Sequence, residues 1–463
     1  MHRAHKGKDL EPKEKAASVA LEPEIEEVEL RRPARRFGRL FGPRRGRVPL
    51  TVEQRNERIL YIEMLFQSIA GAGALSFVAV FLVRLGAPNW LVGVHASLPA
   101  LVTILAILPM GAFVRRQRSL VRVVNGARMV FRSVIASFAL LVYLPVTVAP
   151  FVLVFAEGLL AIPGSALNVA QTTILGRATT PERRPTMLST RMAVHGLMAS
   201  AVGLLAGQWL DRVVYPLNYQ LLFVSALVAG LGSVIVLSRL RLPETPPQQV
   251  AERPRVGIGQ VVALIKATPA FRDYAIASFV FRMGLHLPIA LYSIYRVRTL
   301  GASDAWIGVL LTIQRFLSVF GYIALSRLLA RAKSRQWLWL SCLGVAFYPI
   351  AMALARTPQQ LVASSIIAGL FIPGLDIFMT NTLFQVSSEE ERPSFVAANT
   401  LLANVTAFSA PLLGTLIADL AFIRLALIIA TVLRIVGGLV FWRLKVGVEQ
   451  PETSPAQPAA PPA

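Results

Sequence analysis

Residues 85–94 read LGAPNWLVGV, and residues 300–309 read LGASDAWIGV. Each stretch joins the end of one apolar run to the start of the next, so both are predicted to be short loops between helices. Asn89 and Asp304 stand at the same place in the two stretches, and both residue types favour the N-cap of a helix. The return of this loop in the second half indicates an internal repeat.

A second matching block supports the repeat and gives its direction. The tripeptide Ile-Pro-Gly occurs at 162–164 and again at 372–374, in the same order relative to the first block. We expect the pairs Pro163–Gly164 and Pro373–Gly374 to bend their helices near the middle of a membrane. Repeats that keep their order are parallel, so the two halves are predicted to be related by an axis along the membrane normal.

The composition indicates a membrane protein. Hydrophobic residues make up 55% of the chain and charged residues 16%, against roughly 25% charged residues in soluble domains. A helix that crosses a bilayer needs about 20 consecutive apolar residues. Such helices are predicted at 58–82, 90–113, 128–146, 150–175, 187–209, 217–238, 272–295, 305–326, 336–355, 359–384, 394–417 and 421–443. The predicted fold class is an all-α membrane protein with about twelve transmembrane helices in two pseudo-symmetric six-helix bundles.

Polar segments divide the chain into parts. We predict an N-terminal bundle at 57–240 and a C-terminal bundle at 271–445, joined by a cytoplasmic linker at 241–270 that contains several prolines. Residues 1–56 are expected to form a disordered cytoplasmic arm rich in arginine, and residues 446–463 a disordered tail rich in proline and alanine. The arm is expected either to bind anionic lipids, at about 1 kcal/mol per basic residue, or to act only as a topology signal.

The positions of the charges decide between two classes of protein. The net charge is +22, which in a soluble protein would suggest nucleic-acid binding. Here Lys and Arg gather in the arm and in alternate short loops, which is the pattern that orients membrane proteins. The distribution argues against a nucleic-acid partner and predicts a multi-pass protein of the cytoplasmic (inner) membrane with both termini in the cytoplasm.

The loop after the second predicted helix resembles a motif of the major facilitator superfamily. In that family the loop reads Gly, three residues, Asp-Arg, one residue, Gly and then basic residues, whereas residues 111–118 here read GAFVRRQR. Gly111 and Arg116 match the motif, and an arginine stands in the place of its acidic residue. In the second half, Arg331 and Lys333 keep the basic character. The resemblance covers about residues 57–445 and implies that these four residues gate the cytoplasmic face.

The resemblance also implies a function. Members are secondary transporters that work by alternating access, and predicted helices one, four, seven and ten would line the central site. Residues 203–207 read GLLAG, which keeps part of the glycine-containing motif of the family's exporters. This partial match does not establish antiport. Export of an amphipathic compound is favoured over uptake of a metabolite.

Polar residues inside predicted spans are candidate site residues, because a charge near the bilayer centre costs on the order of 3 kcal/mol. In the fourth predicted helix, Glu157, Gly164, Asn168 and Gln171 recur at helical spacing and share one face. Glu157 is interpreted either as a proton or cation site or as a structural hydrogen-bonding residue between helices.

In the seventh predicted helix, Arg282 and His286 lie one turn apart on one face. They could neutralise an anionic substrate or pair with Glu157, and His286 is also of the type that titrates near neutral pH. The alternative for His286 is a packing role.

The remaining candidates lie in four other predicted helices. Asp376 in the tenth could pair with a basic residue or serve structurally. In the first helix, Gln67 lies deep, whereas Glu63 lies near the inner interface, where it could snorkel or favour the helix N-terminus. Arg315 in the eighth helix is a possible site residue without an assigned role, and Arg434 in the twelfth is expected to snorkel toward the cytoplasm.

Together these patterns predict a secondary active transporter, with a small-molecule substrate and a proton as the coupling ion, carried by Glu157 or Asp376. No Gly-rich phosphate loop is present, the five histidines lack zinc spacing, and the single cysteine excludes an intrachain disulfide, so no cofactor, metal or enzymatic role is predicted. A monomer that contacts anionic lipids is expected. The alternative is a transporter-like protein with a lipid- or pigment-binding or assembly role and no solute flux.

Overall fold

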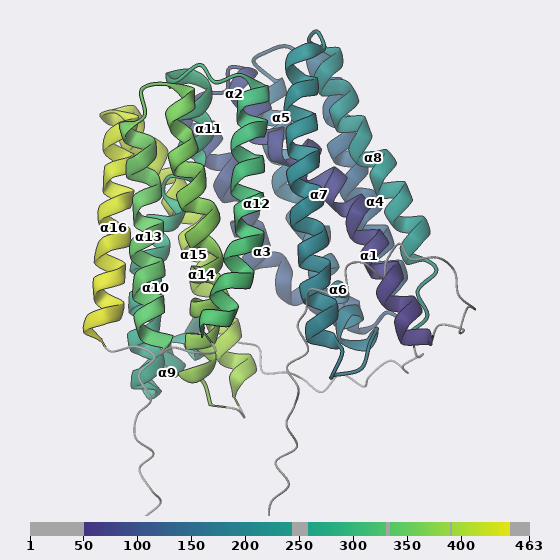
Figure 1. The fold of residues 1–463 in the computed structure, drawn as a ribbon, viewed down its shortest axis with the longest axis vertical. Coiled ribbons are helices and arrows are strands. Elements are labelled where there is room, and N and C mark those ends of the chain that lie inside the picture. The colour runs from purple at the N-terminus through teal and green to yellow at the C-terminus, as the bar shows by residue number, and fades with distance from the viewer. Residues whose placement is uncertain (1–50, 243–257, 330–333, 389–390, 445–463) are drawn as a thin grey trace, which may run out of the picture. The chain divides into compact units, whose positions relative to one another are not determined.

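The computed structural model describes the chain except for residues 1–50, 243–257, 330–333, 389–390 and 445–463. Most of the predicted arm, most of the linker and nearly all of the predicted tail therefore lie outside the described residues. All regular structure in the described ranges is helical (Figure 1).

The first half contains six membrane crossings, several of them built from more than one helical segment. The first is α1 (Val52–Ala70), a π-helical turn (Gly71–Leu75) and α2 (Ser76–Arg84), and the second is α3 (Asn89–Arg115). The third is α4 (Leu120–Ser137) with a 3-10 segment (Phe138–Tyr143), and the fourth is α5 (Ala149–Leu159) with α6 (Ala161–Arg177). The fifth and sixth are α7 (Arg184–Arg212) and α8 (Leu217–Leu237).

The second half repeats this plan. A short helix, α9 (Ile258–Ala267), precedes a crossing formed by α10 (Pro269–His286), α11 (Ile289–Ile294) and a π-helical turn (Tyr295–Thr299). Then follow α12 (Asp304–Leu329), α13 (Ser334–Leu354), α14 (Leu361–Gln385) after a 3-10 turn (Pro358–Gln360), α15 (Arg392–Leu420) and α16 (Ile423–Arg443).

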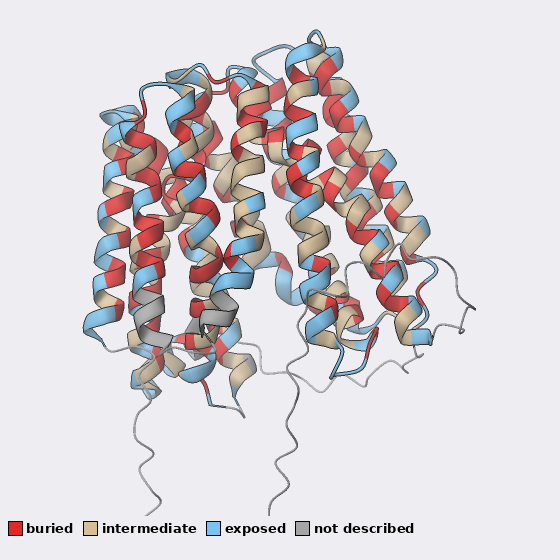
Figure 2. Cartoon of the chain, viewed as in Figure 1, coloured by how far each residue is buried: buried red, intermediate tan, exposed pale blue. Residues whose placement is uncertain are grey.

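The crossings confirm the predicted fold class. Within the described residues, 11 helices are long and apolar enough to span a membrane, and Leu340–Leu354 within α13 adds a shorter apolar helix. Apolar side chains such as Leu105, Leu205 and Val228 are exposed, and Figure 2 shows exposed residues along the length of several helices. Exposed apolar surface of this extent indicates contact with lipid.

Two helices begin at least six residues earlier in the sequence than predicted. The helix α1 begins at Val52 because Thr51 and Gln54 form a capping box, in which each side chain bonds the other residue's backbone N–H. The helix α4 begins at Leu120 rather than at 128. Arg128 and Arg132 therefore lie well inside the third crossing and not at its end.

The Ile-Pro-Gly blocks differ between the halves. In the fourth crossing the helix is interrupted at Leu160, between α5 and α6. Pro163 has no N–H, and its ring crowds the carbonyl four residues earlier, at Leu159, which accounts for an interruption at this place. In the tenth crossing, Pro373 lies within the continuous helix α14.

The halves pack on each other mainly through two helix pairs, α7 with α12 and α3 with α15. Glycines allow the backbones to approach closely at the first pair. A Cβ atom on Gly207 would lie 2.6 Å from the Asp304 carbonyl oxygen and 2.9 Å from the Gly308 Cα. Small residues at such contacts let the backbones of the two helices pack directly against each other, as is common between membrane helices.

The expectation that Arg434 snorkels toward the cytoplasm is wrong. Its side chain is 1% exposed and lies inside the second half. The guanidinium donates hydrogen bonds to the carbonyl oxygens of Gly284 (2.9 Å) and Val345 (2.7 Å) and to the hydroxyl of Tyr292 (3.0 Å). Burial is tolerated because oxygen acceptors in three neighbouring helical segments replace water.

Candidate functional site

The predicted polar stripe of the fourth crossing divides into three environments. Glu157, on α5, lies 2.5 Å from the Nε2 atom of His95 on α3, and both side chains are largely buried. Asn168, on α6, is exposed, and a Cβ atom on Gly164 would have no other atom within 4 Å. Gln171 accepts a hydrogen bond from Arg128 on α4. Glu157 therefore pairs with His95 and not with Arg282 or His286.

A buried charge cluster occupies the interior of the first half. Glu63 on α1 is 0% exposed, and its carboxylate lies 2.8 Å from Arg128 on α4 and 3.2 Å from Arg191 on α7. The expectation that Glu63 snorkels at the inner interface is wrong, because both of its oxygens face arginines. We call Glu63, Arg128, Arg132 and Arg191 the arginine cluster.

Amide and hydroxyl groups extend the arginine cluster. Arg132 donates to the Oε1 atom of Gln67 (2.9 Å), and the amide of Gln67 donates to Ser233 on α8 (3.2 Å). Arg128 donates to the same Ser233 hydroxyl (2.9 Å). Gln67 and Gln171, both predicted site residues, therefore orient guanidinium groups.

Sequence reasoning did not single out His95 or the three arginines of the arginine cluster. Each arginine lies within a predicted span, 128–146 or 187–209. Because charged residues are rare inside membranes, this position alone could have marked all three as candidate site residues. The pairing of His95 with Glu157 had no such signal, since it joins two helices that are far apart in the sequence.

The predicted residues of the second half lie closer to the surface of their bundle. Asp376, on α14, is exposed and accepts a hydrogen bond from Tyr322 on α12 (3.1 Å). Arg282, on α10, is half-buried and acts electrostatically on Asp376. His286 lies 3.0 Å from the Thr406 hydroxyl on α15. Asp376 and Arg282 thus form one loose group, whereas His286 contacts a neighbouring helix of its own bundle.

Two residues lie near the contact between α7 and α12. Arg315, on α12, is half-buried and acts electrostatically on His195 of α7. His195 in turn lies 2.9 Å from the Ser68 hydroxyl on α1. Arg315, for which the sequence supplied no role, therefore lies within electrostatic range of His195 in the first half.

The loops that defined the repeat join the two halves by reciprocal contacts, which we call the loop latch. Arg84, at the end of α2, donates to the Asp304 carboxylate (2.9 Å) and to the Ala302 carbonyl oxygen (3.1 Å). Arg298 donates to the Asn89 side-chain oxygen (2.6 Å) and to the Ala87 carbonyl oxygen. Ala87 corresponds to Ala302 and Asn89 to Asp304 in the repeat. An arginine of each half therefore donates hydrogen bonds to the same two repeat positions of the other half.

Positive backbone φ angles shape both loops of the loop latch. Gly86 has a φ of +82° and Gly301 a φ of +62°, a conformation that glycine adopts without strain. The Tyr219 hydroxyl donates to the second oxygen of Asp304 (2.9 Å). These groups border a pocket of about 820 Å³ whose lining includes Arg84, Asp211, Tyr219 and Asp304.

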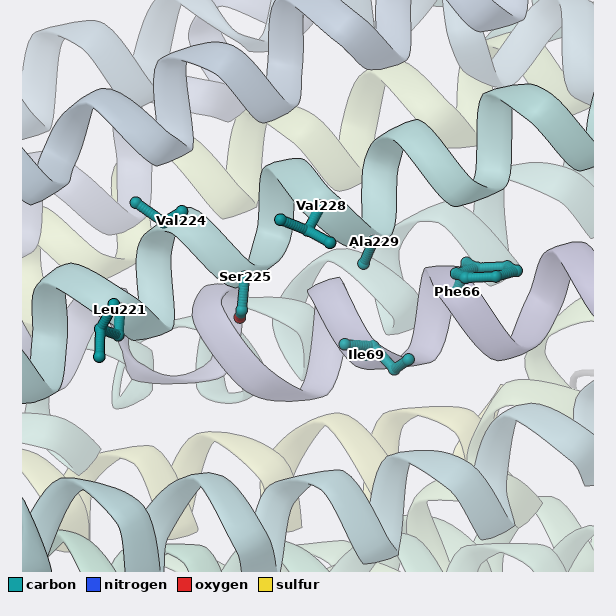
Figure 3. Close-up of a pocket in the computed structure, with 7 residues that line it drawn as sticks. All are labelled: Phe66, Ile69, Leu221, Val224, Ser225, Val228 and Ala229. Carbon is teal, nitrogen blue, oxygen red and sulfur yellow. The ribbon is translucent and has the colours of Figure 1, made fainter.

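A second pocket lies between α1 and α8 and is apolar (Figure 3). Its lining carries one polar side chain, Ser225, among Phe66, Ile69, Leu221, Val224, Val228 and Ala229. A surface of this kind fits lipid chains and offers no group to select or couple a solute. It is therefore not the candidate transport site.

The predicted gating residues fall partly within the structure. Gly111 is buried near the end of α3, and Arg116 is exposed just after it. Arg331 and Lys333 lie outside the described residues. In the described ranges, no three His, Cys, Asp or Glu side chains gather as a metal site would require.

Comparison with known proteins identifies the class. The model of the Major Facilitator Superfamily matches residues 60–360 and 274–462, so the matches span most of the chain. This protein belongs to the Major Facilitator Superfamily, and it is a membrane transporter rather than an enzyme. No curated protein matches the sequence.

Solved structures share the fold at low sequence identity. A point mutant of the nucleoside transporter NupG is 14% identical with a TM-score of 0.65, over 84% of this chain and 99% of that one. A POT family transporter in complex with a thioalcohol-conjugated peptide is 13% identical with a TM-score of 0.62, over 84% and 96% of the two chains. A bacterial homologue of the human lysosomal transporter Spinster, inward-facing and occupied, is 12% identical with a TM-score of 0.62, over 86% and 97%.

Proposed function

We propose that this protein moves a small amphipathic compound across the cytoplasmic membrane by alternating access, driven by the proton gradient. Family membership supports secondary transport, and the paired contacts of α7 with α12 and α3 with α15 supply surfaces on which two halves can rock. The structural neighbours include transporters named for a nucleoside and for peptides, so the shared fold leaves the substrate open.

The observation that supports proton coupling is the contact between Glu157 and His95. Two titratable side chains lie 2.5 Å apart on different helices and are largely shielded from solvent. Protonation of the carboxylate would remove its attraction for a charged imidazole and so loosen α5 from α3. Asp376, which accepts a hydrogen bond from Tyr322, is the second candidate carrier.

The direction and the topology belong to the same proposal. Gly203 and Gly207 keep part of the exporter motif, which favours efflux, with uptake of a metabolite as the alternative. The distribution of Lys and Arg favours cytoplasmic termini, which would put the loop latch on the outer face. We propose a monomer whose basic segments contact anionic lipids.

The first experiment is ligand-dependent thermal unfolding of the detergent-purified protein, against a panel of sugars, amino acids, lipophilic cations, drugs and organic anions at two pH values. A ligand at 100 times its dissociation constant should stabilise the fold by about 2.7 kcal/mol, which is readily measured. The hit is then assayed for flux into proteoliposomes with an imposed pH gradient. A blank across the panel would favour a lipid- or pigment-binding role without flux.

Carrier variants test the coupling. Glu157→Gln should abolish flux driven by the pH gradient while leaving exchange of the substrate across the membrane, because exchange needs no net proton movement. His95→Gln should weaken coupling in the same assay. Flux that responds to the pH gradient in both Glu157→Gln and Asp376→Asn would exclude both residues as the proton carrier.

A further inference from the structure

The arginine cluster holds more positive than negative charge. The Glu63 carboxylate forms ion pairs with Arg128 and Arg191 and acts electrostatically on Arg132, and within the described part of the chain no other carboxylate pairs with these three arginines. All four side chains are buried, with exposed fractions of 0% for Glu63, 2% for Arg128, 6% for Arg132 and 4% for Arg191. Buried charges are normally paired, because an unpaired charge in a membrane interior is expensive.

Each arginine also keeps a donor without an acceptor. In the described structure, Arg128 Nε, Arg132 Nη1 and Arg191 Nε are buried and make no hydrogen bond. These donors come from two helices, α4 and α7, and belong to the same cluster. The neighbouring amides do not use them, since Gln67 already accepts from Arg132 and Gln171 from Arg128.

The arginine cluster adjoins a more open part of the fourth crossing. Gln171, which contacts Arg128, lies one helical turn from the exposed Asn168 on α6. A further turn back, a Cβ atom on Gly164 would meet no other atom within 4 Å. This face of α6 therefore leads from accessible side chains to the buried guanidinium groups.

We propose that the arginine cluster binds an oxyanion, either a carboxylate or a phosphate. The planar guanidinium fork matches the geometry of both groups and binds them through paired hydrogen bonds. An oxyanion would supply the missing negative charge and accept from the unpaired donors. We assign this oxyanion to the transported solute, and in that respect the inference rests on the proposed transport function.

The test measures thermal unfolding of the full-length protein in dodecyl maltoside, titrated with sodium benzoate or sodium phosphate at constant ionic strength set with sodium chloride. We expect a saturable rise in unfolding temperature for at least one of the two anions. Arg132→Gln should weaken the apparent affinity by about tenfold or more, as loss of a charge-assisted hydrogen bond implies. Arg122→Gln, an exposed arginine on the same helix, is the matched control and should respond like the wild type.

Arg132 is the position of choice because its guanidinium donates a hydrogen bond to Gln67 and not to Glu63. Without added anion, Arg132→Gln should unfold at or above the wild-type temperature, since it removes an uncompensated buried charge. That result would also show that the variant is folded. Arg132→Lys, which keeps the charge and loses the fork, should give an intermediate affinity.

Two results would overturn the oxyanion site: no saturable response to either anion or to phosphatidylglycerol in mixed micelles, or an undiminished response in Arg132→Gln. A response to phosphatidylglycerol alone that is lost in Arg132→Gln would keep the site, assign the oxyanion to a lipid headgroup and refute its transport. Anion binding without flux in proteoliposomes would reject the proposed function and leave the site standing. Flux of a solute that is insensitive to Arg132→Gln, without anion binding, would reject the site alone.

Discussion

The two halves share their loops and their helix order but bury charge in different ways. In the first half, Glu63 lies among three arginines inside the bundle. In the second half, the fully buried Arg434 is held by carbonyl oxygens and a hydroxyl, whereas Arg282 and Asp376 lie nearer the surface of the bundle. A repeat therefore specifies a scaffold and its junctions, while each half acquires its own polar interior.

The difference has a physical basis. The N–H donors of a single arginine can be satisfied by backbone carbonyl oxygens of neighbouring helices. Arg434 therefore needs no acidic partner. A carboxylate has no hydrogen to donate when ionised and depends on cations or N–H groups. Glu63 therefore requires its arginines, and the stability of the first half depends on this buried ion pair.

The largest expected effect comes from Glu63→Gln. The substitution leaves Arg128 and Arg191 without their counter-charge, and breaking one partner of a buried pair costs about 3–5 kcal/mol. Asp376→Asn in the second half should cost less than about 1 kcal/mol, because that carboxylate is exposed. Thermal unfolding of both variants in detergent checks the contrast, with the exposed Glu182→Gln as a control. Equal losses for Glu63→Gln and Asp376→Asn would remove the distinction between the halves.

The second effect concerns the contact between the halves. Gly207→Ala places a Cβ atom against the backbone of Asp304 and Gly308, which cannot move aside as a flexible side chain can. We expect a loss of about 1–3 kcal/mol, the usual cost of overpacking, together with reduced flux. Gly126→Ala on α4, where a Cβ atom meets open space, is the matched control and should be neutral or slightly stabilising. An unchanged unfolding temperature in Gly207→Ala would show that the halves do not meet this closely.

Much of the scaffold could be predicted from the sequence, because length, hydropathy and repeated loops report directly on membrane helices. Asn89 and Asp304 were predicted to be N-caps, but they are the first residues of α3 and α12, and the capping positions are Pro88 and Ser303. Both residues are instead central to the loop latch. What the sequence did not reveal is that each accepts from an arginine of the opposite half. Such contacts depend on how the two bundles pack against each other, and the sequence of one half does not indicate which residues of the other half it will contact.

The candidate site was predicted less well than the scaffold. Glu157 was recognised as a buried acid, but its partner His95 lies on another helix, and no local spacing connects them. Arg128 and Arg132 were overlooked because the third helix was predicted to begin at 128, which made them residues of a helix end. The snorkelling expected of Glu63 and Arg434 was wrong for a related reason, since position along a span does not tell whether a side chain faces lipid or the bundle interior.

A third prediction tests the reciprocity of the loop latch. Arg84→Ala and Arg298→Ala should each destabilise the latched state by a similar amount, about 1.5 kcal/mol, since each removes two hydrogen bonds to corresponding places. That energy corresponds to roughly a tenfold shift in the conformational equilibrium. Spin labels at Val214 and Arg356, both exposed near the latched ends and outside the latch, report the shift as a longer distance between the halves. A large effect from one arginine and none from the other would show that the symmetry is geometric and not energetic.

The smallest expected effect lies at the far end of the first half, where the halves differ again. Glu57 on α1 accepts two hydrogen bonds of 2.8 Å from Arg183, and its hydrogen bond raises the pKa of the Arg183 guanidinium above its ordinary value. The arginine therefore stays charged at every pH at which the protein is handled. By the offset of the repeat, the corresponding residue of the second half is Arg272, which forms an ion pair with its own neighbour Asp273 at 3.3 Å.

This contrast predicts that Glu57→Gln lowers the free energy of unfolding by about 1 kcal/mol, because it weakens a tie between α1 and the start of α7. The loss stays modest because the Arg183 side chain is 50% exposed and the Thr179 hydroxyl can still donate to the new amide oxygen. Asp273→Asn should change stability by less than about 0.5 kcal/mol, since its ion pair joins adjacent residues of one helix and holds no helices together. Thermal unfolding at low and high salt separates the two variants, because added salt should narrow the difference between wild type and Glu57→Gln by screening the half-exposed pair. A larger loss in Asp273→Asn than in Glu57→Gln would mean that the first crossing of each half is anchored in the opposite way, with the tighter attachment in the second half.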